Sequence, residues 1–551
     1  MRLPIYLDYA ATTPVDASVA RAMSEVLGSE AEFGNAASAT HVFGHRAQAR
    51  IESARRQVAA LIGASHEDIV FTSGATESNN LAVLGAARAN AHRGRHILTS
   101  RIEHKAVLDP CRQLEREGFT VTYVTSDNAG RIDPEAVRAA LRPDTSLVSI
   151  MHVNNETGVV QDIRRIGAIC RERGILFHTD AAQSVGKLPL DVSLLPVDLL
   201  SFTAHKLYGP KGIGALYVRA AARPLLRPIT FGGGQERGLR PGTLATHQIV
   251  GFGVACEVAK RYVTAEHTSI RLLRDRLWRH LQRLDGVHLN GEAAPRLPEI
   301  LNVSFEGVEG ESLVTALTSL AVTTGSACNS ASGEPSYVLR ALGRSSALAQ
   351  SSLRFSFGRP TTEADIDRAA AAVLFQIQRL RAVSPAARSA PGASLPGSRA
   401  ESQPADSAAV PPADAGGETP GVRDRLSPLA QRYFDALPGA GELSQSDAVG
   451  AEKILRGEAG SVAAEAWVRF HLRVAGGIVK NALFQAYGCP HTLALAAWMT
   501  EQLPGRAVDD LVPGTPSAWL SALDVPVEKL GRLLVIEDAL RAALLPQGRP
   551  L

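Results

Sequence analysis

Apolar and polar positions alternate along residues 50–220 in a way that predicts buried strands separated by amphipathic helices. Seven short apolar runs, bounded by Gly, Asn, Asp or His, are expected to form the buried parallel strands of an α/β sheet. They are IVFTSG, HILTS, VTYV, LVSIMHV, ILFHTDAAQ, LLSFTAH and GALYV. The carboxyl ends of such strands meet at one edge, so the polar residues after each run should line a ligand site.

The pattern changes after residue 260. Residues 1–260 form the predicted large α/β domain. Residues 261–382 combine a long charged helix near IRLLRDRLWRHLQRL, the strand candidates ILNVSF and SSLRFSFG, and a helix after TTEADID, which predicts a smaller α+β domain. Residues 383–425 are dominated by Pro, Ala, Ser and Gly, and we expect a disordered linker. Residues 426–551 contain the strand pair WVRFHLRV and ALFQAY within helical periodicity, which predicts a separate small domain.

Composition narrows the choice of partners and compartment. In 551 residues, 58 Lys and Arg nearly balance 55 Asp and Glu, so the charge of +3 predicts no direct binding of nucleic acid or of an anionic membrane. Five cysteines are few, odd in number and far apart, which argues against a disulfide framework and for a reducing compartment. No run reaches the roughly 18 apolar residues of a membrane span. We therefore expect a cytoplasmic protein.

The polar ends of three predicted strands suggest a cofactor that carries a phosphate and a ring. Lys206 follows LLSFTAH and is a candidate for the amine of a Schiff base, although a single Lys is usually a surface charge. Gly74, Ala75 and Thr76 lie between a strand and a helix, where backbone N–H groups bind a phosphate, or where Thr caps the helix. Asp180 is suited to pair with a pyridinium nitrogen, and its alternative is a helix cap.

Further candidates stand after neighbouring strands and in a later loop. His104 is suited to stack on a ring, and Asn155 and Gln183 to donate to a ring hydroxyl; their alternatives are structural histidine and turn chemistry. Cys328 lies among small and turn-forming residues in TTGSACNSASGEPS, which predicts an exposed, mobile loop. Since a thiol has a pKa of about 8.5, a modest depression there would give useful thiolate. Cys111, Cys170 and Cys256 lie in apolar periodic sequence and are expected to be structural. No metal site is predicted.

Long motifs then resemble one family. LDYAATTP, VFTSGATESNN, EHKAV, HVNNETGVVQDI, DAAQSVGKLP, FTAHKLYGPKGIGALYV, RPGTLATHQIVG, GSACNSAS and EPSYVLRALG occur in this order in residues 1–382. They resemble the class V aminotransferase-like cysteine desulfurases of bacterial iron–sulfur cluster assembly. The resemblance implies the aspartate-aminotransferase type of pyridoxal-phosphate fold (fold type I). It also implies a homodimer, with the N-terminal segment contributing to the small domain.

The resemblance assigns roles to the matching positions. It makes Lys206 the Schiff-base lysine and Arg354 the clamp for the substrate carboxylate. Pyridoxal phosphate would be held at its phosphate and around its ring by Ala75, Thr76, His104, Asn155, Asp180, Gln183, Thr203, His205 and, from the partner subunit, Thr243. Asn155 would also contact the substrate. Thr203 and Gln235 stand where the family commonly has Ser and His.

The implied reaction converts L-cysteine to L-alanine. The substrate displaces Lys206 from the cofactor, the lysine amine removes the Cα proton with His104 beside the ring, and the Cys328 thiolate attacks the substrate sulfur. Cys328 then carries a persulfide, for delivery to an iron–sulfur scaffold or another sulfur acceptor and to thiolated tRNA. A selenocysteine lyase on the same fold is the alternative, and the Gly-Ser-Ala-Cys loop counts against it.

Residues 426–551 resemble the U-type iron–sulfur scaffold through FQAYGCPHTLALAAWMTEQLPGR and KLGRLLVIEDALRAAL. A scaffold needs about three cysteines and an acidic or His ligand, and here only Cys489 survives. Residues 456–467 lack the first Cys and the Asp, and Gly531 and Arg532 stand where His and Cys are expected. We therefore expect no cluster on a single chain. Cys489 is either a sulfur acceptor or a packed residue of a degenerate docking module.

Overall fold

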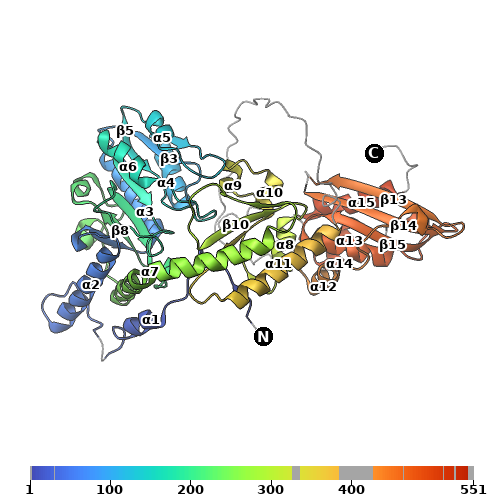
Figure 1. Ribbon diagram of the computed structural model, residues 1–551, viewed down its shortest axis with the longest axis horizontal. Coiled ribbons are helices and arrows are strands. Elements are labelled where there is room, and N and C mark those ends of the chain that lie inside the picture. Colours follow the sequence, from blue (N-terminus) through green and yellow to red (C-terminus); the bar gives the residue numbers. More distant parts are fainter. Residues whose placement is uncertain are drawn as a thin grey trace. The chain divides into compact units, whose positions relative to one another are not determined.

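A computed structural model describes residues 3–29, 32–324, 335–383, 426–462, 465–512, 514–526 and 529–543. The predictions for Cys328 and for the linker at 383–425 lie outside these ranges, apart from Val383. The chain divides into two compact units. Figure 1 labels helices and strands of both. The first comprises Met1–Ser304 and most of residues 319–371, and the second comprises Phe305–Thr318 and Ala372–Leu551. Each unit is described by itself.

A seven-stranded sheet forms the centre of the first unit, in the order β2-β8-β7-β6-β5-β3-β4. Each apolar run predicted to be a strand is one of them. The bounds are Ile69–Thr72 (β2), His96–Ser100 (β3), Thr120–Val124 (β4), Thr145–Ser149 (β5), Leu176–Asp180 (β6), Leu199–Thr203 (β7) and Gly214–Val218 (β8). The pairs β3–β4, β3–β5, β5–β6 and β6–β7 are parallel, as predicted.

Strand β8 differs from the prediction because it runs antiparallel to both β7 and β2. The prediction of a parallel strand for GALYV is therefore wrong. A parallel return needs a crossover of about a dozen residues or more, usually a helix. Residues 204–213 join β7 to β8 through the short 3-10 turn Ala204–Lys206 (η2), so the chain turns straight back. This turn fixes Lys206 at the carboxyl end of β7.

Helices cover both faces of the large sheet, because successive residues of a strand point to opposite sides. In β5, Leu147 belongs to one apolar cluster and Val148 to the other. Helices α3 and α4 contribute to the cluster of Leu147, and α2, α6 and α7 to that of Val148. The bounds are Val42–Leu61 (α2), Ala75–Ala89 (α3), Lys105–Arg116 (α4), Pro134–Ala140 (α5), Ile163–Glu172 (α6) and Thr246–Leu281 (α7).

Helix α7 is longer than the sequence suggested. The predicted charged helix is its second half, so the domain boundary placed between residues 260 and 261 falls inside a continuous helix. A smaller sheet in the order β12-β10-β9 contains the predicted strands ILNVSF and SSLRFSFG, and β1 pairs with β11. The bounds are Ile5–Tyr6 (β1), Val287–Leu289 (β9), Ile300–Phe305 (β10), Leu320–Ala321 (β11), Ser352–Ser356 (β12), Ala17–Ser24 (α1), Tyr337–Ala341 (α9), Ser346–Gln350 (α10) and Glu363–Val383 (α11).

The second unit contains an antiparallel sheet in the order β13-β14-β15. The predicted strand pair is β14 and β15, and Gly476 and Gly477 at their turn have φ of +58° and +76°, which glycine adopts at little steric cost. The bounds are Lys453–Ser461 (β13), Ala466–Ala475 (β14), Ile478–Tyr487 (β15), Gly310–Ala316 (α8), Pro428–Ala436 (α12), Pro490–Gln502 (α13), Pro516–Leu523 (α14) and Leu530–Ala542 (α15). Among the described helices, none combines the length and the apolar composition of a membrane crossing.

Candidate active site

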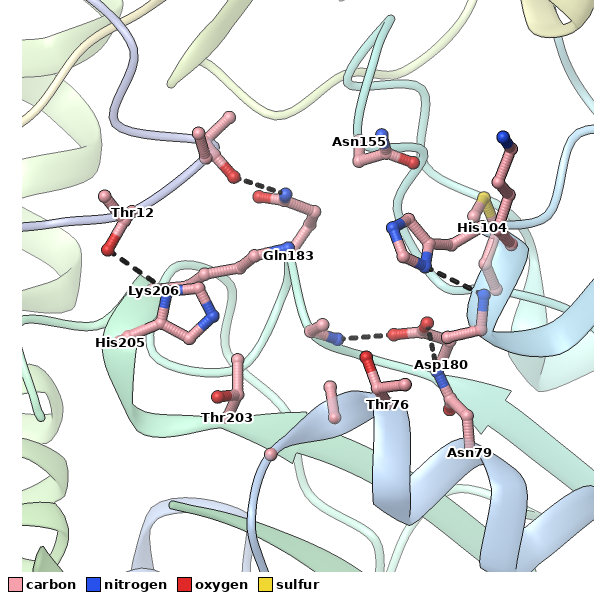
Figure 2. A pocket seen from close by; sticks show the side chains of 18 of the residues that line it. Thr12, Thr76, Asn79, His104, Asn155, Asp180, Gln183, Thr203, His205 and Lys206 are labelled. Carbon is pink, nitrogen blue, oxygen red and sulfur yellow. Dashed lines mark hydrogen bonds between the residues drawn. The ribbon is translucent and has the colours of Figure 1, made fainter. Parts of the chain in front are cut away.

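A cavity of about 540 Å³ opens at the carboxyl edge of the large sheet. Residues that follow β2, β3, β5, β6 and β7 converge on it, together with one residue of β12, as the strand-end argument requires. The structure thus brings together the predicted residues Ala75, Thr76, His104, Asn155, Asp180, Gln183, Thr203, His205, Lys206 and Arg354. Figure 2 labels all of them except Ala75 and Arg354.

Lys206 lies at one end of this cavity, as the last residue of η2. Its neighbour His205 places Nδ1 3.2 Å from the hydroxyl of Thr12. Burial, and then the charges of Lys206 and Lys211, lower the pKa of His205 to about 4. The imidazole is therefore neutral at neutral pH.

The amino terminus of α3 provides a cradle for an anion. Its first N–H groups have no acceptor within the helix, and the helix dipole favours a negative charge there. A Cβ on Gly214 would lie 2.7 Å from the Cα of Gly74, so glycine allows β8 to pass this close. On the side of Gly74 itself, a Cβ would meet only the Thr203 hydroxyl within 4 Å, at 3.9 Å. This space fits the phosphate of the expected pyridoxal phosphate.

Asp180 ends β6 and presents a buried carboxylate to the cavity. The Asn79 side chain donates to Oδ2 at 2.7 Å, and the backbone N–H of Ala182 donates to Oδ1 at 2.9 Å. Only 6% of Asp180 is exposed. A carboxylate held in place by two donors fits the ring nitrogen of pyridoxal phosphate, which carries a proton when it acts as an electron sink.

His104 caps α4 and faces the cavity (Figure 2). Its Nδ1 accepts the backbone N–H of Ala106 at 3.1 Å, so the ring proton of the neutral form is on Nε2. Burial lowers the pKa of His104, Asp180 opposes this, and Lys206 adds to it. The result is a neutral aromatic ring with one fixed tautomer, which is suited to stack on a flat cofactor.

Arg354 is buried in β12, with 3% of its surface exposed. Its Nη1 donates to the carbonyl of Asn155 at 2.9 Å, and its Nη2 to the Asp8 carboxylate at 2.7 Å. Its Nε is buried and has no hydrogen-bond partner within the described ranges. A buried guanidinium with one unused donor beside the cavity fits a carboxylate ligand.

Three predicted residues are not in this group. Thr243 lines a different cavity, of about 250 Å³, beside Arg55 and Glu236. Cys328 lies outside the described residues. Cys489 belongs to the second unit.

Sequence reasoning missed Asn79, Asp8 and Lys187. Asn79 had a signal, since it follows Thr76 by three residues on the same helix face. Asp8 had none, because its partner Arg354 is 346 positions away.

Cys489 caps α13 and is fully buried. Its Sγ lies 3.4 Å from the hydroxyl of Thr492. Arg532, where a scaffold would have Cys, forms an ion pair of 2.9 Å with Glu465. Burial lowers the pKa of the Arg532 guanidinium, but the Cys489 side chain and the carboxylates of Glu309 and Glu465 outweigh it and raise that pKa. No cluster of three His, Cys, Asp or Glu suited to a metal occurs among the described residues.

Two known families match different parts of the chain. The family described as Aminotransferase class-V matches residues 5–369, and the NifU-like N terminal domain matches residues 431–546. Cysteine desulfurase IscS of Ectopseudomonas mendocina (strain ymp) is 58% identical over 385 residues, which are 70% of this chain and 95% of that protein.

Solved structures resemble the same part of the chain. A "NIFS-LIKE PROTEIN" has a TM-score of 0.63 at 36% identity, over 68% of this chain and 100% of its own. The structure "SspA in complex with cysteine" has a TM-score of 0.58 at 42% identity, over 64% of this chain and 98% of its own.

Proposed function

The chain belongs to the cysteine desulfurases of the class-V aminotransferase family, and we propose that Lys206 and Cys328 carry its reaction. It is a pyridoxal-phosphate enzyme that mobilises sulfur from L-cysteine for iron–sulfur cluster assembly, and it carries a NifU-like domain after the desulfurase. The observation that supports the residue roles is the convergence of Lys206, Asp180, Arg354 and the α3 amino terminus on one cavity.

The bound cofactor supplies an electron sink for the electron pair released at the substrate Cα. Asp180 would hold the proton on the ring nitrogen, and the amino terminus of α3 with Thr203 would hold the phosphate. Arg354 binds the substrate carboxylate and so orients the Cα–H bond. With the cofactor bound, the Lys206 amine would accept the Cα proton and return a proton to the product. The Cys328 thiolate attacks the substrate sulfur, the C–S bond breaks, and L-alanine leaves a persulfide on Cys328.

This assignment is tested with L-cysteine and a reductant, by measuring alanine and sulfide. Lys206→Ala should lose both products, and Cys328→Ser should lose persulfide and sulfide. Lys260→Ala is the matched control, since Lys260 lies on α7 and donates to the Ala60 carbonyl at 2.9 Å, outside the cavity. Full activity of Cys328→Ser would contradict the mechanism. L-Selenocysteine in place of L-cysteine separates a desulfurase from a selenocysteine lyase.

A homodimer would complete the cofactor site. Thr243 lies in a cavity other than that of Lys206, which supports the proposal that it reaches the cofactor of a partner subunit. Several large apolar side chains of the first unit are more than 40% exposed, as expected of a surface that a second copy covers. They are Leu27, Phe33, Val42, Phe43 and Phe231.

Mixed dimers test this arrangement. Lys206→Ala and Thr243→Ala are each expected to be nearly inactive. If Thr243 acts across the dimer, unfolding and refolding the two together restores activity, because one of the two sites in a mixed dimer then has both native residues. Failure to restore activity, with mixed dimers shown by mass spectrometry, would place Thr243 in its own subunit's site or outside both.

For the NifU-like domain we propose a docking role, with sulfur transfer to Cys489 as the second candidate. The full burial of Cys489 supports docking, because an acceptor thiol must be reached by the Cys328 persulfide. Within the second unit, the Ser312 hydroxyl of α8 donates to the Gly488 carbonyl at 2.8 Å, and Lys529 pairs with Glu311 at 2.9 Å. These contacts support α8 as the docking element.

Mass spectrometry after exposure to L-cysteine separates the two candidates. A docking role predicts that Cys489 remains unmodified. It also predicts that Lys529→Glu increases the rate of hydrogen exchange of the backbone amides of α8 and α13. A persulfide on Cys489 that is absent from Cys328→Ser would establish transfer and refute a purely docking role. Arg506→Glu is the matched control, because Arg506 pairs with Asp510 at a distance of 3.0 Å and not with α8.

We also place the reaction in the cytoplasm. The five cysteines are few and odd in number, and the four that lie in the described ranges are buried and free. Free thiols of this kind are typical of a reducing compartment. Partial permeabilisation of the cell surface, followed by assays of desulfurase activity in the released and the retained fractions, would test this location.

A further inference from the structure

Lys187 lies behind the candidate active site, on the turn that follows β6. Gly186, with φ of +78°, lets the chain turn there, and a Cβ on it would come within 3.2 Å of the Cβ of Leu207. The turn therefore packs directly against the segment that carries Lys206. The Lys187 ammonium donates to Oε1 of Gln183 at 3.1 Å, and Nε2 of Gln183 donates to the Ala10 carbonyl at 2.9 Å.

These two contacts determine which way the Gln183 amide points. An ammonium can only donate and a carbonyl can only accept, so the amide oxygen must face Lys187 and the amide nitrogen must face Ala10. A primary amide nitrogen has two hydrogens, and Ala10 takes one of them. Gln183 lines the cavity (Figure 2), so its second N–H is available to a ligand there.

Lys187 is half-buried and interacts with an acidic group. Burial lowers its pKa to about 8, Glu299 opposes this, and Lys206 and Arg354 add to it. Glu299 is 5% exposed, and its own pKa is raised to about 7 by burial, against the pull of Lys187 and with a further push from Glu266. Glu299 is thus the acidic group that opposes the loss of the Lys187 charge.

A small cavity of about 20 Å³ lies between these groups and is lined by Lys187, Lys206 and Glu299. This volume suits one water molecule. Oε2 of Glu299 is buried and has no hydrogen-bond partner in the described part of the chain. A water in this cavity would give that oxygen a donor and link Glu299 with Lys187. Lys206 borders both this cavity and the larger one, so the charge of Lys187 is felt at the reacting lysine.

We propose that Lys187 is a positioning residue for the cofactor. It holds the Gln183 amide so that one N–H is available to the ring hydroxyl. It thereby sets the pH at which the bound cofactor loses its imine proton. The proposal rests on the placement of Gln183 beside the ring. An N–H donor and a nearby cation both stabilise the anionic form of a hydroxyl, and so favour loss of the neighbouring proton.

The test is a pH titration of the visible absorbance of the holoenzyme without substrate. Lys187→Met should raise the midpoint by about one pH unit, because it removes the cation and the constraint on Gln183. Lys187→Arg keeps the charge and a donor and should stay close to the native midpoint. Glu299→Gln should lower the midpoint slightly, because Lys187 then has no opposing charge. Lys260→Met is the control, and circular dichroism confirms that each variant is folded.

A second comparison separates this proposal from the one on which it rests. Gln183→Leu should also raise the midpoint, and Lys187→Met added to it should raise it by less than Lys187→Met alone. A shift in Gln183→Leu without one in Lys187→Met would overturn the role of Lys187 and leave the placement of Gln183 intact. No shift in either variant would overturn that placement as well. Additive shifts would overturn the claim that Lys187 acts through Gln183.

Discussion

Removing the carboxylate of Glu236 should strongly destabilise the first unit, because it leaves the buried Arg55 cation with only its more exposed acidic partner, Glu52, at 3.2 Å. Two nitrogens of Arg55 on α2 donate to the two carboxylate oxygens of Glu236, at 2.8 and 2.7 Å. Glu236 also accepts the backbone N–H of Phe71 in β2 at 2.8 Å. Arg55 and Glu236 are 5% and 7% exposed. One ion pair therefore joins α2, β2 and the turn that leads to Thr243.

The expected cost can be worked out from these contacts. Breaking a buried pair by removing one partner costs about 3–5 kcal/mol, since the remaining Arg55 charge is not solvated and keeps only the pair with the partly exposed Glu52. In a unit of this size each kcal/mol lowers the melting temperature by about 2 °C, so Glu236→Ala should lower it by about 6–10 °C. Thermal unfolding followed by near-ultraviolet circular dichroism measures the change.

A double variant tests the reasoning behind this number. In Arg55→Met with Glu236→Gln the buried charges are gone, and an amide oxygen still accepts from Phe71. Replacing both charges of a buried pair is often close to neutral, so the double variant should melt above Glu236→Ala by about 4 °C or more. Two results would refute this reasoning. In the first, the decreases in melting temperature of the single variants Arg55→Met and Glu236→Gln simply add in the double variant. In the second, Glu236→Ala melts within about 2 °C of the native protein.

Three other predictions concern the site and its sheet. Arg354→Lys should raise KM for L-cysteine about ten- to hundredfold, because a lysine lacks the planar guanidinium that binds a carboxylate through two N–H groups. Arg359→Lys alters a pair with Asp16 outside the main cavity and should leave KM unchanged. Equal KM values for the two variants would refute the role of Arg354 in binding the substrate carboxylate. Gly214→Ala should weaken cofactor binding about tenfold in a reconstitution assay, since the added Cβ meets Phe202 O at 2.7 Å, while Gly28→Ala has nothing within 4 Å and should bind normally. Burial lowers the pKa of His178 to about 4, so its neutral form contributes stability that is present above about pH 6.5 and is lost as the pH falls through 4. The free energy of unfolding of the native protein, measured relative to that of His178→Gln, should therefore drop by up to about 3 kcal/mol over that range. A difference that stays constant with pH would refute this prediction.

The cofactor cavity was predictable because its residues follow strands, and parallel strands end at one edge. Asp180 ends its strand, and Lys206 and His104 stand within four residues of the ends of theirs, so the topology brings the three together whatever the details of packing. The apolar runs themselves are buried on both faces, which is why they stand out in the sequence. The local pattern therefore carries both the sheet and most of the site.

The groups that orient these residues were not predictable in the same way. Asp8 meets Arg354 across 346 positions, and neither residue has a neighbour in the sequence that announces the other. Lys187 stands only four positions after Gln183, but its contact depends on a turn packed against Leu207. Strand β13 was missed because it contains Gly457 and Gly460, which usually weaken a strand. At Gly457 a Cβ would lie 2.2 Å from the Ala539 carbonyl, so the close approach of α15 explains that glycine.

The NifU-like domain matches its family in sequence but lacks, among the described residues, a group of ligands suited to a metal. Cys489 keeps its place at the start of α13, but the position expected for another cysteine is now Arg532, paired with Glu465. A metal cluster bound here would lie beside the Arg532 guanidinium, which repels positively charged metal ions and cannot act as a ligand. Moving Arg532 away would break its ion pair with Glu465. The same cation would favour an anionic persulfide sulfur on Cys489, so we expect access, and not charge, to limit any transfer. The burial of Cys489 therefore favours docking over transfer, and a change that opens α8 without altering Arg532 is the one expected to let sulfur in.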